Sequence, residues 1–259
     1  MQGPIMSWPV YRPVDRRALR SPPPGRFARF RSLTGGGDVS ALSNPNTIPP
    51  YATLPDLPLD DDDRAELTQQ IWNQLITGRG DVDDFIDIYG EDHDLTDEQL
   101  EAAFGALRTA RLRQQAEIGA YTSRTIAAFE ELNAGGVVAR ADFSCCGSCA
   151  SGEIWGERDD SRHWKGYAYF HQQDTDRLVE AGETYIGYGA FPPEDFDEAT
   201  YDALSDDAKE DLYTADVRRL LDDVMFPVFR RHGIEPEWNR DLGTRVLLKN
   251  ADWYDPIEA

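Results

Sequence analysis

The sequence predicts an α+β protein with a mixed sheet of about five strands, on which a long N-terminal helix and roughly two or three further helices pack. Two observations carry this prediction. A stripe of apolar residues at helical spacing runs from Leu100 to Leu132. Residues 137–252 then alternate between short runs typical of strands and longer stretches typical of helices. A chain of 259 residues is long enough to bury a sizeable core.

The first 58 residues differ in composition from the rest of the chain. They are rich in proline, arginine and glycine, with Pro-Pro-Pro-Gly at 22–25 and three glycines at 35–37. Such a segment cannot bury enough apolar surface to offset the entropy that it loses on ordering. We therefore expect residues 1–58 to be a disordered leader.

Residues 59–95 are expected to form an acidic, helical lead-in to the main domain. Four aspartates at 60–63 suit the positive end of a helix dipole. The apolar residues behind them recur at helical spacing: Leu67, Ile71, Trp72, Leu75 and Ile76. Gly78 and Gly80 should end this helix, and residues 82–89 predict a further short helical segment.

The main α+β domain is predicted to span residues 96–259 and to begin with its longest helix. Thr96 and Gln99 have the spacing of a capping box, in which each side chain bonds the backbone N–H of the other residue. Asn-Ala-Gly-Gly at 133–136 should end the helix, since these residues accept a left-handed conformation. We expect this helix, broken near Gly119, to form one wall of the core.

Beyond this helix the sequence predicts strands and helices in alternation. The expected strands are 137–143, 166–171, 184–189, 234–239 and 245–249. The expected helices are 150–158, 175–181 and 206–232. Pro227 lacks a backbone donor and should kink the last of these helices.

Charge is distributed very unevenly along the chain. Residues 1–55 carry seven arginines against two aspartates, a balance of +5, and the whole chain carries −22, so residues 56–259 sum to −27. An acidic body repels phosphate backbones, and we therefore expect no nucleic-acid partner.

The sequence also predicts the compartment. No run of about 18 apolar residues occurs, so we expect no transmembrane helix and no membrane partner. The N-terminus lacks the apolar segment and the cleavage site of a secretory signal. Three clustered cysteines do not make the disulfide framework of a secreted domain. We expect a cytoplasmic protein.

All three cysteines lie within five positions, in the sequence Phe143-Ser144-Cys145-Cys146-Gly147-Ser148-Cys149. If the alternation of the preceding strand continues through Phe143, Cys145 falls on its apolar face. Cys145 is then expected to be a buried core cysteine, which is a common fate of free thiols. Cys146 and Cys149, a CxxC pair, are left as the residues of chemical interest.

One interpretation of this pair is a metal site, with zinc as the candidate cofactor. Zinc is usually held by four ligands, most often cysteine sulfur and histidine nitrogen. The candidate ligands are Cys146, Cys149, His163 and His171. Cys145 is not included, because adjacent residues rarely converge on one cation. The sequence therefore contains an incomplete zinc signature.

Two other interpretations of the cysteines stay open. A CxxC pair at the N-terminus of a helix is typical of a redox dithiol, because the helix dipole favours the thiolate of the first cysteine. Alternatively, the thiols are core residues without chemistry.

A second candidate site lies on the strand predicted at 166–171. Side chains alternate along a strand, so Tyr167, Tyr169 and His171 are expected to share one face. We expect this face to bind a ligand.

Asp174 follows His171 by three residues and is expected to orient its imidazole. His171 and Asp174 therefore join Cys146 and Cys149 as candidate catalytic residues. The alternative is that Asp174 is only the N-cap of the helix predicted at 175–181, and that His171 is an ordinary polar residue.

The order of these motifs resembles a domain-of-unknown-function family of actinobacteria. The residues that carry the resemblance are Phe143-x-Cys145-Cys146-x-x-Cys149, Gly166-Tyr167-x-x-Phe170-His171-x-Gln173-Asp174-Thr175, Tyr188-Gly189-Ala190-Phe191 and Glu237-Trp238. The resemblance covers residues 97–250. It implies a bacterial cytosolic protein with an α+β domain, and it leaves the function open.

Two functions are compatible with these observations. The first is a non-catalytic module that binds a protein partner or a small-molecule ligand near the cysteine motif. The second is a zinc-binding or thiol-redox protein, either an enzyme or a sensor, that uses the CCxxC motif.

Overall fold

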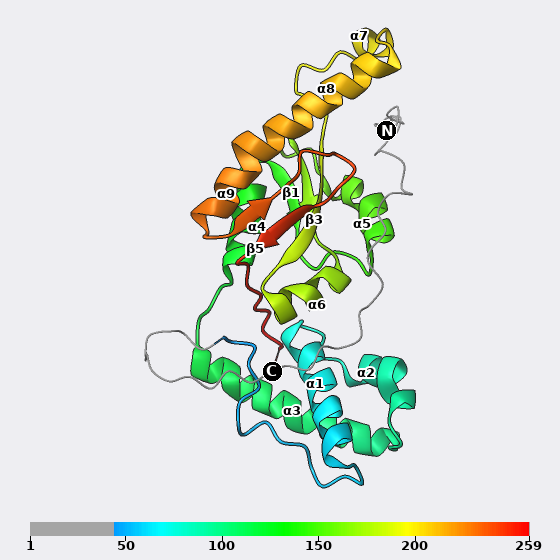
Figure 1. Ribbon diagram of the computed structural model, residues 1–259, viewed down its shortest axis with the longest axis vertical. Coiled ribbons are helices and arrows are strands. Elements are labelled where there is room, and N and C mark those ends of the chain that lie inside the picture. Colours follow the sequence, from blue (N-terminus) through cyan, green and yellow to red (C-terminus); the bar gives the residue numbers. More distant parts are fainter. Residues whose placement is uncertain (1–43, 259) are drawn as a thin grey trace.

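The computed structural model describes residues 44–258, which form two lobes (Figure 1). The helical lobe contains α1 (Asp61–Ile76), α2 (Val82–Tyr89), the short 3-10 helix η1 (Gly90–Asp92) and α3 (Asp97–Ile118). The sheet lobe contains the other described helices and the strands. The chain beyond the last strand returns to the helical lobe, where Ile257 is buried.

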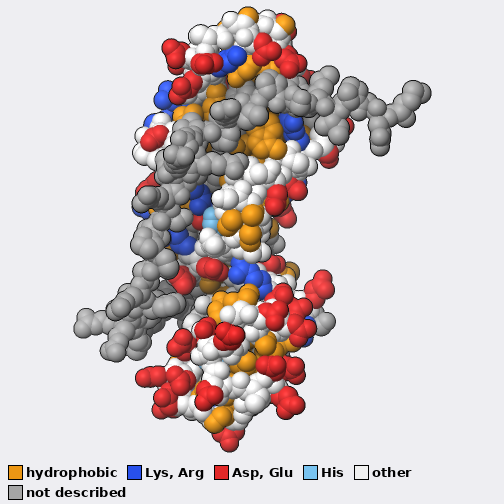
Figure 2. All heavy atoms as spheres, turned by 90° about the vertical axis from the view of Figure 1, so that its right-hand side faces the viewer, with side chains coloured by type: hydrophobic (Ala, Val, Ile, Leu, Met, Phe, Trp, Pro, Cys, Tyr) orange, Lys and Arg blue, Asp and Glu red, His pale blue; other side chains and the backbone are white. Residues whose placement is uncertain are grey.

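The helical lobe has an apolar core of its own. Asp60 caps α1 by accepting a hydrogen bond from the Asp63 N–H at 2.9 Å, and the capping box predicted for Thr96 and Gln99 is present at the start of α3. The largest buried side chains of this core are Leu67, Ile71, Trp72, Leu75, Ile76, Phe85, Leu100, Phe104 and Leu107. Aspartate and glutamate side chains are spread over the outer surface of this lobe (Figure 2).

Residues 44–58 pack on the helical lobe, although the sequence predicts that they belong to a disordered leader. The Asn46 carbonyl accepts from Trp72 Nε1 at 2.8 Å, and the Asn46 amide donates to the Trp253 carbonyl at 2.7 Å. Ala52 and Leu57 are buried in the same core. The prediction is wrong for these residues because partners far away in sequence hold them, which local composition does not reveal. The rest of the predicted leader, residues 1–43, lies outside the described residues.

The apolar stripe that the sequence assigns to one long helix belongs to two helices in different lobes. α3 ends at Gly119, whose φ of 73° confirms the predicted break, and α4 (Arg124–Ala134) follows. Leu107 of α3 lies in the core of the helical lobe, whereas Leu132 of α4 lies under the sheet. The prediction that the whole helix packs on the sheet is therefore wrong. The two lobes part between α3 and α4, not at the predicted domain start at residue 96.

A mixed sheet of five strands forms the sheet lobe and confirms the predicted α+β fold class. The strands are β1 (Val137–Arg140), β2 (Gly166–Tyr169), β3 (Thr184–Ala190), β4 (Glu235–Glu237) and β5 (Val246–Lys249). Their order in the sheet is β1-β2-β3-β5-β4. β1 and β2 are parallel, and the other neighbouring pairs are antiparallel.

Helices cover both faces of this sheet. Side chains from α4 and from α6 (Gln172–Ala181) pack with Ala168 and Phe170 in the main core. On the opposite face, α5 (Gly147–Glu153) and the 3-10 helix η2 (Ile154–Glu157) pack with Tyr167 and Tyr169. The alternation predicted along residues 167–170 is therefore confirmed.

The helix predicted at 206–232 is a continuous helical run with an irregular middle. It consists of α8 (Asp206–Arg219), the π-helix η3 (Leu220–Met225) and α9 (Phe226–Arg231), and the short α7 (Glu198–Asp202) precedes it. The wider π-helical turns end at Met225, two residues before Pro227, which has no backbone N–H to donate. The start of α8 projects beyond the sheet in Figure 1.

Two glycines of β3 make room for the tyrosines of β2. Gly189 is opposite Tyr167 and Gly187 is opposite Tyr169 in the antiparallel pair. The two tyrosine rings are stacked, with their centroids 6.2 Å apart. A Cβ atom added at Gly189 would lie 2.5 Å from Cζ of Tyr167, well inside van der Waals contact.

We expect Gly189→Ala to lower the free energy of unfolding by about 1–3 kcal/mol, the usual cost of overpacking. Gly105 on the exposed side of α3 is the matched control, because no atom lies within 4 Å of a Cβ added there. Gly105→Ala should stabilise the protein by up to about 1 kcal/mol through helix propensity. Denaturant unfolding of Gly189→Ala and Gly105→Ala tests both expectations. Equal changes in the free energy of unfolding would contradict the tight contact at Gly189.

Candidate functional site

The loop between β1 and α5 turns the cysteine motif away from the sheet. Asp142 and Ser144 have φ values of 49° and 63°, in the left-handed region that breaks strand alternation. Ser144 O accepts from the Gln172 N–H at 3.2 Å, and Thr175 Oγ1 donates to Asp142 Oδ1 at 2.5 Å. Cys145 is therefore exposed, and the prediction that it is a buried core cysteine is wrong.

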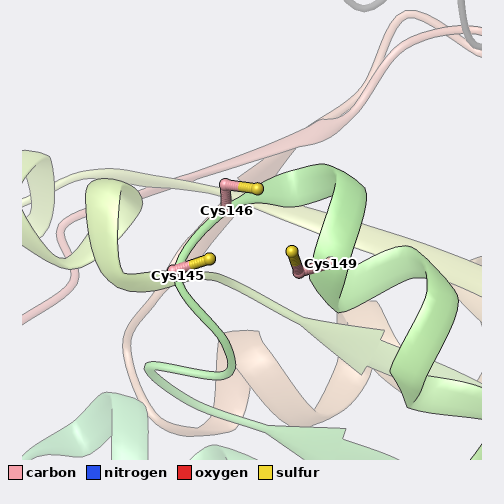
Figure 3. Close-up of side chains that lie close together, drawn as sticks. All are labelled: Cys145, Cys146 and Cys149. Atoms are coloured by element: carbon pink, nitrogen blue, oxygen red, sulfur yellow. The ribbon is translucent and has the colours of Figure 1, made fainter.

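The structure brings all three cysteine sulfurs together. Their Sγ atoms lie within 4.8 Å of one another and face a common space (Figure 3). Cys145 and Cys149 are exposed and Cys146 is half-buried, and all three thiols are free. The sulfurs of the adjacent Cys145 and Cys146 lie on the same side, and the first turn of α5 places Cys149 beside both of them. Cys145, which the sequence analysis leaves out of the candidate ligands, therefore joins Cys146 and Cys149.

The start of α5 gives two of these thiols, Cys146 and Cys149, different pKa values. Cys146 is the N-cap residue of the helix, close to the first backbone N–H groups of α5. The nearby Cys149 N–H, assisted by the Cys149 thiol and the Ser148 N–H, lowers the pKa of Cys146. The neighbouring sulfurs of Cys145 and Cys146 raise the pKa of Cys149 to about 11. Cys146 is therefore the more readily ionised member of this CxxC pair.

His171 lies beside the cysteine loop and is paired with Asp174, as the sequence analysis expects. Its Nε2 is 3.0 Å from Asp174 Oδ2, and the same edge of the ring faces the α-carbon of Gly147. Burial lowers the pKa of His171, against the opposite effect of the Asp174 carboxylate. The other ring nitrogen, Nδ1, is buried without a hydrogen-bond partner.

Asp174 joins His171 to a distant arginine. Its two carboxylate oxygens accept from Arg245 Nη1 at 3.0 Å and from Arg245 Nη2 at 2.5 Å. Asp174 Oδ2 also accepts from the backbone N–H of His171 at 3.2 Å. The helix therefore starts at Gln172 with His171 as its N-cap, and the predicted start at residue 175 is wrong.

Two further residues from the sequence analysis lie elsewhere. His163 is exposed before the N-terminal end of β2, whereas the cysteines follow the C-terminal end of the parallel strand β1. The structure therefore does not bring His163 to the cysteines. Among the described residues, the compact group of potential metal ligands contains the three cysteines and no histidine.

Tyr167 and Tyr169 are buried under α5, in one cluster with Phe191 and Ile154. A ligand could reach their rings only by displacing this packing. The residues that sequence reasoning missed are Arg79, Asp142 and Arg245, since each acts through partners far away in the chain. Arg79 Nη2 of the helical lobe is 3.5 Å from Asp142 Oδ1 and donates to the Gln172 carbonyl at 3.3 Å, so the lobes meet beside the cysteine loop.

Fold and site together define an α+β protein that presents a cluster of three free thiols at the start of a helix. The chain belongs to the family described as a domain of unknown function, DUF6891, whose model matches residues 60–255. A search of curated proteins and a search of solved structures found no match. None of the helices between residues 44 and 258 combines the length and the apolar character needed to cross a bilayer.

Proposed function

We propose that this protein is a binding module whose cysteine triad, Cys145, Cys146 and Cys149, holds a thiophilic metal ion, with zinc as the first candidate. The observation that carries the proposal is the convergence of three sulfurs within 4.8 Å. Zinc–sulfur bonds of about 2.3 Å in a tetrahedral site separate the sulfurs by about 3.8 Å. Small rotations of exposed side chains would close the triad to that spacing.

The chemistry of the donor set also fits. Three thiolates form a soft ligand set, which favours zinc or copper(I) over magnesium or calcium. The nearby Cys149 N–H, which lowers the pKa of Cys146, would stabilise the thiolate form of this ligand. Three protein ligands leave one position of a tetrahedral ion open. A donor atom from a small molecule or from a protein partner could occupy that position.

The expected role is non-catalytic, and the expected partner is a protein or a small molecule rather than nucleic acid or a membrane. The charge of −27 on residues 56–259 supports the exclusion of nucleic acid. We also propose a cytoplasmic location, because neighbouring exposed thiols stay reduced there.

Metal analysis of the full chain, purified without a histidine tag or chelators, tests this proposal. We expect about one zinc ion per chain. Cobalt(II) added to the metal-free protein should give an intense thiolate-to-cobalt absorption that saturates at about one equivalent and that zinc abolishes. His163→Asn is the control and should leave the titration unchanged, because His163 lies apart from the triad.

Two results would contradict the zinc proposal. Copper(I) bound in place of zinc would keep the metal site but change its ion. A protein that takes up neither metal and forms a reversible Cys146–Cys149 disulfide would instead favour the thiol-redox alternative.

A further inference from the structure

A second candidate site lies before the N-terminal end of β2, away from the cysteine triad. A cavity of about 190 Å³ opens between the helical run α8–η3 and the end of the sheet. It is smaller than the roughly 300–1,000 Å³ typical of pockets for drug-sized ligands. Its volume therefore suits a smaller molecule. His163, which the triad does not use, is one of its lining residues.

The cavity is lined by an ion pair with an incomplete set of hydrogen bonds. Asp216 Oδ1 accepts from Arg219 Nη1 at 3.1 Å. Asp216 Oδ2 is buried without a hydrogen-bond partner. Burial raises the pKa of the Asp216 carboxyl, against the opposing effect of Arg219. A buried acceptor without a donor is costly, so a ligand that brings a donor would be stabilised here.

Two cationic side chains, Lys165 and Arg219, also line this cavity, beside the acidic Asp216 and Glu194. Lys165, one of three lysines in a chain of net charge −22, lines it together with Arg219 and His163. Lys165 Nζ donates to the Gly135 carbonyl at 2.8 Å and keeps further N–H groups for a ligand. Groups that attract an anion therefore lie in the same cavity as the Asp216 carboxylate.

Apart from Glu194, the remaining lining is apolar, and part of it belongs to the irregular helix. Leu220 and Val224 of η3 and Phe191, which follows β3, are among the lining residues. Gly166 accommodates Leu220, because a Cβ atom added at Gly166 would lie 2.5 Å from Leu220 Cδ2. π-helical turns are rare and occur frequently at functional sites, where they place side chains that a regular helix would turn away.

We propose that this cavity binds a small zwitterion with an apolar side chain, of the chemical class of the free aliphatic α-amino acids. The ligand ammonium group would donate to Asp216, and its carboxylate would pair with Arg219 and Lys165. The aliphatic side chain would lie against Leu220, Val224 and Phe191. Asp216 and Arg219 carry opposite charges and lie next to each other, and the ammonium and carboxylate groups of an α-amino acid are also adjacent. The ligand ammonium can therefore face Asp216 while its carboxylate faces Arg219. This site is independent of the proposed metal site.

Isothermal titration of the full chain with three related molecules tests the proposal. L-leucine carries both charges, 4-methylpentanoate lacks the ammonium group, and 3-methylbutylamine lacks the carboxylate. We expect L-leucine to bind and each analogue to bind about 10- to 100-fold more weakly, since each loses hydrogen bonds to a charged group. Absence of L-leucine binding at millimolar concentration, or an analogue that binds equally well, would overturn the proposal.

Variants then assign the contacts. Asp216→Asn and Lys165→Gln should each weaken L-leucine binding by about tenfold or more. Asp223→Asn is the matched control, because Asp223 is exposed on η3 and does not line the cavity, and it should bind as the wild type does. If Asp216→Asn does not fold, Lys165→Gln still decides, because Lys165 is exposed. If Lys165→Gln binds L-leucine with wild-type affinity, Lys165 does not bind the ligand carboxylate, and the assignment is overturned.

Discussion

Cys146→Ser is expected to weaken zinc binding by roughly 100- to 1,000-fold. Zinc sites of four ligands in small domains contribute about 10–16 kcal/mol, or on the order of 2.5–4 kcal/mol for each ligand, and each 1.4 kcal/mol is a factor of ten. We expect a larger effect at Cys146 than at Cys149, because the nearby Cys149 N–H lowers the pKa of Cys146 whereas the neighbouring sulfurs raise the pKa of Cys149. A serine hydroxyl at this position stays protonated and does not replace a thiolate.

The measurement is a competition titration against a chromophoric zinc chelator, together with a thermal melt of the metal-free protein. Ser148→Ala is the matched control, because Ser148 is an exposed residue of the same turn and has no sulfur. Without metal, Cys146→Ser should change the free energy of unfolding by no more than about 0.5 kcal/mol, as is usual at the surface. Equal zinc affinity in Cys146→Ser and in Ser148→Ala would exclude Cys146 as a ligand.

Elements whose signals are local were predictable from the sequence. The capping box of Thr96 and Gln99 uses residues three positions apart, and the alternation of Tyr167 with Ala168 is a property of adjacent residues. Both were confirmed. The position of Cys145 was predicted wrongly, because the alternation was extended through two residues with a left-handed backbone, Asp142 and Ser144. Neither residue is a glycine, so composition gave no warning of the turn.

Features that depend on distant partners were not predictable. Asn46 is held by Trp253, which lies 207 residues further along the chain. The pairing of Asp174 with Arg245 spans 71 residues. The spacing of a single sequence contains no signal for such pairs. For the same reason His163 and His171 looked equivalent as zinc ligands, although the structure places only His171 near the cysteine loop.

Asp174→Ala is expected to lower the free energy of unfolding by about 3–5 kcal/mol, because it leaves a charged partner without compensation. Arg245 would lose both carboxylate bonds, and its remaining bond to the Tyr185 carbonyl cannot neutralise its charge. In a chain of this size the loss should lower the melting temperature by roughly 10 °C. Asp176→Ala is the control, since the Asp176 side chain is 54% exposed and its ion pair with Arg79 is long, at 3.6 Å. That change should cost no more than about 1 kcal/mol.

A double variant separates the cost of a lone buried charge from the value of the ion pair. Replacing both partners, in Asp174→Leu with Arg245→Met, should recover most of the stability lost in Asp174→Ala if the lone charge is the main cost. If the double variant is as unstable as Asp174→Ala, the essential contact is the one between Asp174 and His171 at the start of α6. The cysteine loop is bonded to the same helix start through Gln172, so zinc affinity would then fall together with stability. Measuring the free energy of unfolding and the zinc affinity of the double variant therefore decides the role of the Asp174–Arg245 pair. The pair stabilises either the sheet lobe alone or the proposed metal site as well.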